Sequence, residues 1–99
     1  MEFVDFYIWN KVKDEKATLT FKEDGEQKSF LNFSINGVSL INKEIDLNNE
    51  VQKTMIDNIM DMINPLQDIY YEFQNDKNNE NFEKFKEQSE ALINKINNI

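Results

Sequence analysis

Apolar residues recur at every second position through much of the first 45 residues, and at every third or fourth position from residue 46 onward. The first period is typical of β-strands with one buried face, and the second of amphipathic α-helices. Two glycines interrupt the strand-like region, and one of them, Gly37, follows Asn36 in the strongest short signal for a tight hairpin turn. The pattern therefore predicts a sheet followed by helices.

The hairpin turns determine which side chains share the buried face of the sheet. A type I′ turn at Asn36-Gly37 pairs Ile35 with Val38, and Phe33 with Leu40. These pairings put alternate apolar residues of both strands on one side, because side chains of a strand point alternately to opposite faces. We therefore expect an antiparallel hairpin whose buried side includes all four of these residues.

The same apolar face sets the register of the two earlier hairpins. A three-residue bulged turn that ends in Gly25 pairs Lys22 with Glu26. A loop over residues 13–16 then puts Val12 on the buried side. The expected buried residues of the first three strands are Val4, Phe6, Ile8, Val12, Ala17, Leu19, Phe21, Leu31, Phe33 and Ile35.

A second group of side chains lies on the opposite side of the predicted sheet: Phe3, Asp5, Tyr7, Trp9, Phe30 and Ile41. Contiguous exposed aromatic patches are uncommon on monomers, so this group has two interpretations. In the first, another part of the chain covers it or the residues are ordinary scattered exposure. In the second, it contacts a partner or a second copy. We expect Tyr7 and Trp9 to act as apolar anchors for a partner.

From residue 46 the pattern predicts an antiparallel helical hairpin. Asp46 or Asn49 is suited to cap the first helix, and Gln52 completes a capping-box pattern with Asn49. Pro65 kinks or breaks this helix, and the unchanged apolar phase favours a kinked, near-continuous helix. Its apolar stripe comprises Val51, Met55, Ile59, Met62, Leu66, Ile69 and Phe73. After a polar loop, the second helix carries Phe82, Phe85, Leu92, Ile96 and Ile99, interrupted by Ser89.

These elements make an α+β fold in a single domain over residues 1–99. A four-stranded antiparallel meander sheet occupies residues 1–45, and an αα-hairpin over residues 46–99 packs on one of its faces. The chain has no apolar run near 18 residues, and its first residues, MEFVDFYIWN, carry acids where a signal peptide carries bases. We therefore expect a cytoplasmic protein, in the host cytoplasm if a phage encodes it.

The net charge of −8 is unevenly distributed, because residues 46–76 hold seven acids and a single base. Five of these acids lie opposite the apolar stripe of the first helix, at steps of seven and four: Glu50, Asp57, Asp61, Asp68 and Glu72. Like charges four residues apart destabilise a helix by roughly 0.2–0.5 kcal/mol per pair. Solubility or a cationic partner would explain why the acids are kept.

The composition also argues against several classes of function. The chain has no His, no Cys and no Gly-rich phosphate loop, so we expect neither an enzyme nor a cofactor. The acidic turns at 14–15 and 23–26 do not fit a calcium-binding loop, so we expect no metal site. The negative charge disfavours direct binding to nucleic acid or to anionic membranes.

The sequence therefore predicts a small, acidic, non-enzymatic inhibitor whose partner is a basic protein surface. Its carboxylates would occupy the positions on the partner where nucleic-acid phosphates bind. They would thereby block a nuclease or another nucleic-acid-binding protein. In size and charge the chain is similar to phage anti-CRISPR proteins and other nucleic-acid mimics. Immunity or antitoxin proteins against basic toxins are the first alternative. The second alternative is a homo-oligomeric assembly module, which uses the outer aromatic residues or Met60 and Tyr71. Its affinity would depend little on salt.

Overall fold

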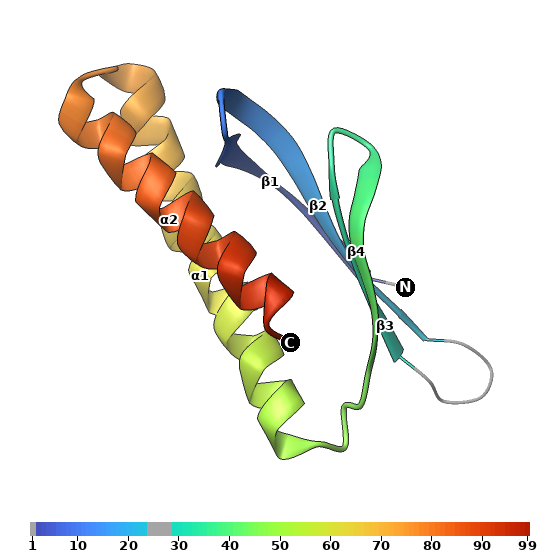
Figure 1. Cartoon of the computed structure of the whole chain (residues 1–99). Helices are drawn as coiled ribbons and strands as arrows, with labels where there is room; N and C mark the ends of the chain where they lie inside the picture. Colours follow the sequence, from blue (N-terminus) through green and yellow to red (C-terminus); the bar gives the residue numbers. More distant parts are fainter. Residues whose placement is uncertain (1, 24–28) are drawn as a thin grey trace.

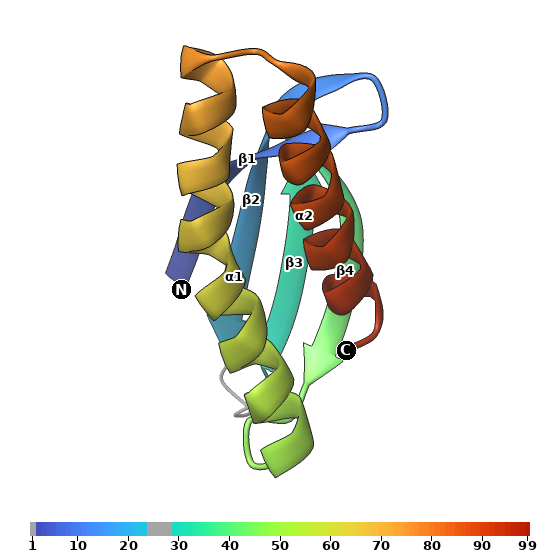
Figure 2. The ribbon, with the colours of Figure 1, turned by 90° about the vertical axis from the view of Figure 1, so that its left-hand side faces the viewer.

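The computed structural model describes residues 2–23 and 29–99 and confirms an α+β fold, with a four-stranded antiparallel sheet followed by two helices. The strands lie side by side in chain order: β1 (Glu2–Asn10), β2 (Lys13–Glu23), β3 (Ser29–Ile35) and β4 (Val38–Ile45). The helices are α1 (Glu50–Asn75) and α2 (Asn79–Asn97). Figures 1 and 2 show the sheet as one layer and the helical hairpin as the other.

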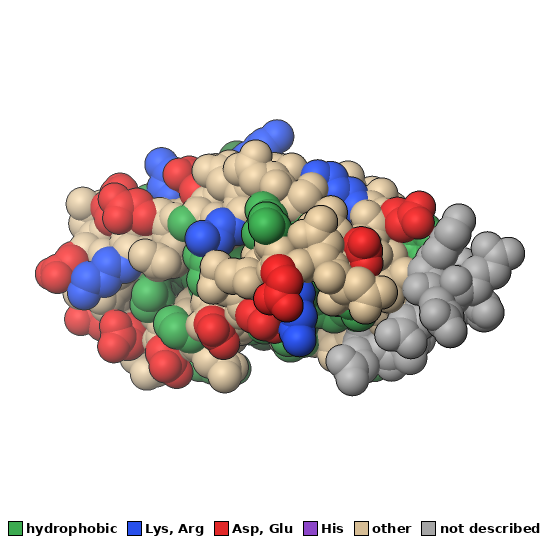
Figure 3. Space-filling view, turned by 90° about the horizontal axis from the view of Figure 1, so that it is seen from below, with side chains coloured by type: hydrophobic (Ala, Val, Ile, Leu, Met, Phe, Trp, Pro, Cys, Tyr) green, Lys and Arg blue, Asp and Glu red, His purple; other side chains and the backbone are tan. Residues whose placement is uncertain are grey.

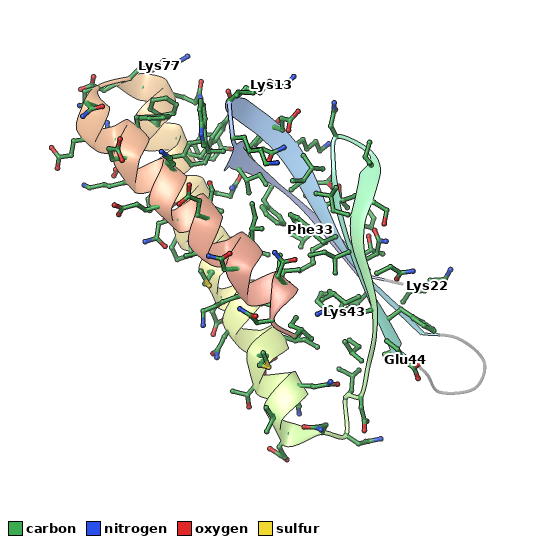
Figure 4. The ribbon with its side chains drawn as sticks, in the orientation of Figure 1. Lys13, Lys22, Phe33, Lys43, Glu44 and Lys77 are labelled. Carbon is green, nitrogen blue, oxygen red and sulfur yellow. The ribbon has the colours of Figure 1, made fainter. Side chains whose placement is uncertain are left out.

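The core lies between these two layers. Phe33 points from the sheet toward the helices (Figure 4), and its ring stacks on that of Phe6 at a centroid distance of 6.4 Å. The predicted buried face is confirmed for Phe6, Ile8, Ala17, Leu19, Leu31, Phe33 and Ile35. The helices bury Ile56, Ile59, Ile63, Leu66, Phe85, Leu92 and Ile96 against it. None of the helices in the described residues is long and apolar enough to cross a lipid bilayer.

The first hairpin is tighter than the sequence predicts. Its turn lies at Lys11 and Val12, where Lys11 has a φ of 60°, and pairing extends to Asn10 and Lys13. The predicted loop over 13–16 is therefore wrong, and so is the burial of Val12, which is 79% exposed. The shorter turn is favoured because it lets more backbone groups pair in the ladder.

The second hairpin is also shifted, by an even number of residues. Lys22 pairs with Phe30, so the predicted pairing of Lys22 with Glu26 is wrong. The predicted turn at Gly25 lies outside the described residues. Because side chains alternate with a period of two, an even shift leaves every side chain on its expected face. The core could therefore be predicted although the register was not.

The third hairpin has the predicted turn, since Asn36 and Gly37 have φ angles of 52° and 80°. Beyond it, a β-bulge pairs Phe33 with Ile41 instead of Leu40. One extra residue reverses the faces of the strand. The predicted burial of Leu40 is therefore wrong, because it is 57% exposed. Val38 keeps its predicted partner Ile35, but its predicted burial is also wrong, because it lies beside the turn at the end of the sheet and is 62% exposed. Ile41, expected on the solvent side, packs against the core instead.

The first helix, α1, continues through Pro65 as one helix, and the kink expected there stays a prediction. Asn49 caps it, because its Oδ1 accepts hydrogen bonds from the second and third residues that follow. Gln52 reaches further back than a capping box requires, and its Oε1 accepts from the N–H of Asp46 at 2.6 Å. Val51 is 68% exposed, so its predicted place in the apolar stripe is wrong: the helix turns Ile56 and Ile63 toward the core instead.

Lys43 joins the sheet to the end of α2. It lies on the inner face of β4, paired with Leu31, and points toward the helical layer in Figure 4. Its Nζ donates to the main-chain oxygens of Asn97 and Ile99, each at 2.9 Å. A cation at the C-terminal end of a helix satisfies unpaired carbonyl groups and complements the helix dipole. Lys43 therefore anchors α2 to the sheet.

Candidate functional site

The acidic face of α1 is defined by Glu50, Asp57, Asp61, Asp68 and Glu72, whose side chains are all exposed. They lie opposite the buried residues Ile59, Ile63 and Leu66, as the helical period requires. Lys53 is the only base along α1. The ion pairs in the described part of the chain use other carboxylates, those of Asp5, Glu15 and Glu80. The acidic face is thus available to an external cation.

Asp and Glu side chains gather over the helical layer of the molecule. Figure 3 shows them on the left of the view, the side formed by the helices, with Lys side chains among them. The second helix contributes Glu80, Glu83, Glu87 and Glu90, but it also carries three lysines. The charge of α2 is therefore mixed, whereas that of α1 has one sign.

A tyrosine cluster, Tyr7, Tyr70 and Tyr71, borders the acidic face. Tyr7 stacks on Tyr70 with ring centroids 4.7 Å apart, and Tyr71 meets Tyr70 edge-on at 5.3 Å. Tyr7 is 37% exposed and Tyr71 is 57% exposed. Because Tyr71 follows Asp68 by three residues, the two side chains are neighbours on the helix surface. Aromatic and acidic groups are thus presented side by side.

Trp9, expected with Tyr7 as an apolar anchor for a partner, is half-buried. Its ring packs edge-on against Phe82 of α2 at 4.9 Å, and Phe82 in turn contacts Phe73 of α1. Of the two interpretations of the outer aromatic residues, cover by another part of the chain therefore holds for Trp9. The reason is that β1 is an edge strand with both helices beside it, so side chains that alternate away from the core still meet the helical layer.

Side chains of the two helices also satisfy the open edge of β1, which the sequence did not reveal. The main-chain N–H of Tyr7 donates to Oε1 of Gln67, and Nε2 of Gln67 donates to the main-chain oxygen of Tyr7, both at 2.9 Å. The N–H of Trp9 donates to Oγ of the fully buried Ser89 at 2.9 Å. The interruption of the α2 stripe at Ser89 was the available signal, because a polar residue in a buried stripe needs a partner. These bonds hold Tyr7 against α1.

Two titratable groups near β1 are shifted. Burial raises the pKa of the Tyr70 hydroxyl above its ordinary value, and the negative charge of Asp14 adds to the shift. The hydroxyl of Thr18, which donates to Asp5 at 2.6 Å, lowers the pKa of that carboxyl, and Lys16 contributes in the same direction. Tyr70 is therefore neutral at physiological pH and acts as an aromatic surface.

No three acidic side chains converge to hold a metal ion within residues 2–23 and 29–99. The acids of α1 follow one another along an open helix surface instead of surrounding a cleft. Such an arrangement suits electrostatic contact with another molecule better than acid–base chemistry, which needs groups that converge on a substrate.

Comparisons with protein-family models, with curated proteins and with solved structures found no match to this chain. The acidic face and the tyrosine cluster are therefore the basis for a functional proposal.

Proposed function

We propose that this chain is a small, non-enzymatic binding protein that uses the acidic face of α1 to occupy the basic surface of a nuclease or another nucleic-acid-binding protein. The observation that carries the proposal is the exposure of five carboxylates along one side of one helix, with one base on the same helix. Like-charged neighbours such as Asp57 and Asp61 do not favour the helix itself. A cationic partner would offset that cost.

The spacing of the carboxylates suits a surface that binds phosphates. At about 1.5 Å of rise per residue, the acidic face extends over about 33 Å from Glu50 to Glu72. Carboxylates four and seven residues apart lie about 6–10 Å from one another, comparable to phosphate separations along a strand. Lysine and arginine side chains that normally contact phosphates would meet carboxylates at similar intervals.

The tyrosine cluster would supply the apolar part of the contact. Charge pairs at the rim of an interface mainly guide encounter, whereas buried aromatic residues carry much of the affinity. Tyr7 and Tyr71 are exposed beside the acidic face, and Tyr7 is held by Gln67. Rigid aromatic side chains lose little entropy on binding.

A phage inhibitor of the anti-CRISPR type is the setting that this chemistry fits first, because its target is a nuclease with a basic channel. An immunity protein against a basic toxin is the alternative, and would use the same face on a smaller target. Both settings imply a cytoplasmic location.

The test is a charge-reversed variant of α1, Asp57→Lys, Asp61→Lys and Asp68→Lys. Its control carries the same change of charge on exposed positions of α2: Glu83→Lys, Glu87→Lys and Glu90→Lys. Each immobilised protein is incubated with a panel of purified CRISPR nucleases and basic toxin nucleases, at about 0.05 M and 0.5 M salt.

We expect the wild type and the α2 variant to retain a nuclease at low salt and to inhibit it, with duplex DNA competing for binding. The α1 variant should bind at least about tenfold more weakly, because three attractive contacts become repulsive. Equal binding and inhibition by the α1 variant, confirmed as folded by circular dichroism, would overturn the proposal.

A further inference from the structure

The outer face of the sheet, on the side away from the helices, is a second surface that the proposed function does not use. Figure 1 shows the helical layer on one side of the sheet only. A shallow groove runs across this outer face, lined by Thr20, Lys22, Phe30, Asn32 and Asn42. Polar side chains thus surround one half-buried aromatic ring.

The register of the strands arranges these residues in rows. Lys22 of β2 pairs with Phe30 of β3, and Phe30 pairs with Glu44 of β4. In Figure 4 both Lys22 and Glu44 point away from the helices. Since neighbouring strands are about 4.8 Å apart, the Cα atoms of Lys22 and Glu44 lie at similar distances on either side of Phe30. This row is therefore self-complementary. When it faces the same row in the reverse order, the lysine lies opposite a glutamate and the glutamate lies opposite a lysine.

We propose that this face is the interface of a homodimer, in which a second copy packs face to face about a two-fold axis that runs along β3. This rotation exchanges the positions of β2 and β4. Lys22 then faces Glu44 of the second copy, Glu44 faces Lys22 of the second copy, and the two Phe30 rings meet at the axis. An axis perpendicular to the strands would oppose Lys22 to itself, so the charge pattern selects the orientation.

The adjoining row is compatible with the same axis. Thr20 pairs with Asn32, and Asn32 pairs with Asn42. The rotation brings Thr20 opposite Asn42 of the second copy and Asn32 opposite its own counterpart. Hydroxyl and amide groups both donate and accept hydrogen bonds, so each of these pairs can be satisfied. Neither of these two rows, Lys22–Phe30–Glu44 and Thr20–Asn32–Asn42, places like charges opposite each other in this arrangement.

The rest of the molecule favours this face over the sheet edges. The edge of β1 is occupied at Tyr7 and Trp9 by the side chains of Gln67 and Ser89. The edge strand β4 carries a bulge and the inward-pointing Lys43, two devices that oppose edge-to-edge pairing. The outer face is also the side away from the acidic face of α1. Two copies with a net charge of −8 each would therefore meet at a surface where the charges of Lys22 and Glu44 cancel. Both acidic faces would remain free.

Charge exchange tests the arrangement by sedimentation equilibrium. Lys22→Glu puts a carboxylate opposite Glu44 of the second copy, and Glu44→Lys puts an ammonium opposite Lys22; each contact occurs twice. Because the interface is only three strands wide, we expect a dissociation constant on the order of micromolar for the wild type. Each single variant should weaken the dimer at least about tenfold. The double variant Lys22→Glu, Glu44→Lys should recover the wild-type constant to within about threefold.

Lys77→Glu is the matched control, since Lys77 is exposed in the turn between the helices, away from the sheet (Figure 4). It makes the same change in net charge as Lys22→Glu and should leave the dimer unchanged. The melting temperature of each variant verifies folding. A wild type that stays monomeric up to about 0.5 mM, single variants that dimerise normally, or a double variant weaker than either single variant would each overturn the proposal.

Discussion

Replacing Ser89 with alanine tests whether the helical hairpin stabilises the edge of the sheet through its polar side chains. Oγ of Ser89 accepts the N–H of Trp9 at 2.9 Å, and the serine itself is fully buried. Because β1 is an edge strand, no neighbouring strand is available on that side to accept this N–H. The alanine variant keeps the helix and the packing but leaves the N–H without its partner.

The expected cost follows from the burial of the two groups. A buried donor left without an acceptor costs roughly 1–3 kcal/mol. Trp9 is half-buried, so water reaches it in part, and we expect about 1–2 kcal/mol. For a domain of this size, the loss corresponds to a decrease in melting temperature of roughly 4–16 °C.

Urea unfolding followed by fluorescence measures this loss directly, because Trp9 is the only tryptophan of the chain. Amide hydrogen exchange at Trp9 should also become faster in Ser89→Ala. The control is Ser39→Ala, which removes an acceptor of Asn32 on the exposed outer face and should cost less than about 0.5 kcal/mol. If Ser89→Ala is as stable as this control, or more stable than the wild type, the serine is not a functional acceptor and the reasoning is refuted.

Three further substitutions test separate features of the fold. Gly37→Ala should destabilise by about 1–2 kcal/mol in urea unfolding through backbone strain alone, since φ is +80° and no atom lies within 4 Å of the added Cβ; an unchanged stability would contradict the assigned turn. Tyr70→Phe should reduce the loss of stability above about pH 10, because a raised pKa keeps the folded phenol protonated while the unfolded one ionises. Melting temperatures that fall equally in both proteins between about pH 9 and about pH 11 would count against this. Lys43→Met should cost about 1 kcal/mol and increase amide exchange at the end of α2; unaltered exchange there would show that Lys43 does not anchor the helix.

The faces of the strands could be predicted from the sequence even where their registers could not. Two hairpins are shifted by even numbers of residues, which leaves residues such as Leu19 and Phe33 on their expected side. The bulge in β4 is different, because a single extra residue exchanges Leu40 and Ile41 between the faces. Nothing in the alternation of β4 marks it, since both residues are apolar.

The position of the helices over the sheet could not be predicted from either pattern alone. An amphipathic stripe shows which side of a helix is buried, but not which strand it covers. The helical hairpin lies beside β1, where it covers Trp9 and lets Gln67 accept a hydrogen bond from the main chain of Tyr7. Nothing in the sequence marks Gln67 for this contact. The acidic face of α1, in contrast, follows from the helical period once the apolar residues face the core. Its exposure was therefore predictable, whereas the tyrosine cluster next to it depends on tertiary packing.

The most direct test of the account is carboxyl footprinting of the complex with a nuclease that the protein is proposed to inhibit. A carbodiimide couples an amine to exposed Asp and Glu side chains, and mass spectrometry measures the modification of each position in the free and bound protein. We predict strong protection of Asp57, Asp61 and Asp68 in the complex, with unchanged modification of Glu83 and Glu87 on α2. Full modification of the α1 carboxylates in a complex that still inhibits the nuclease would contradict the central claim that these groups meet the cationic surface of the partner.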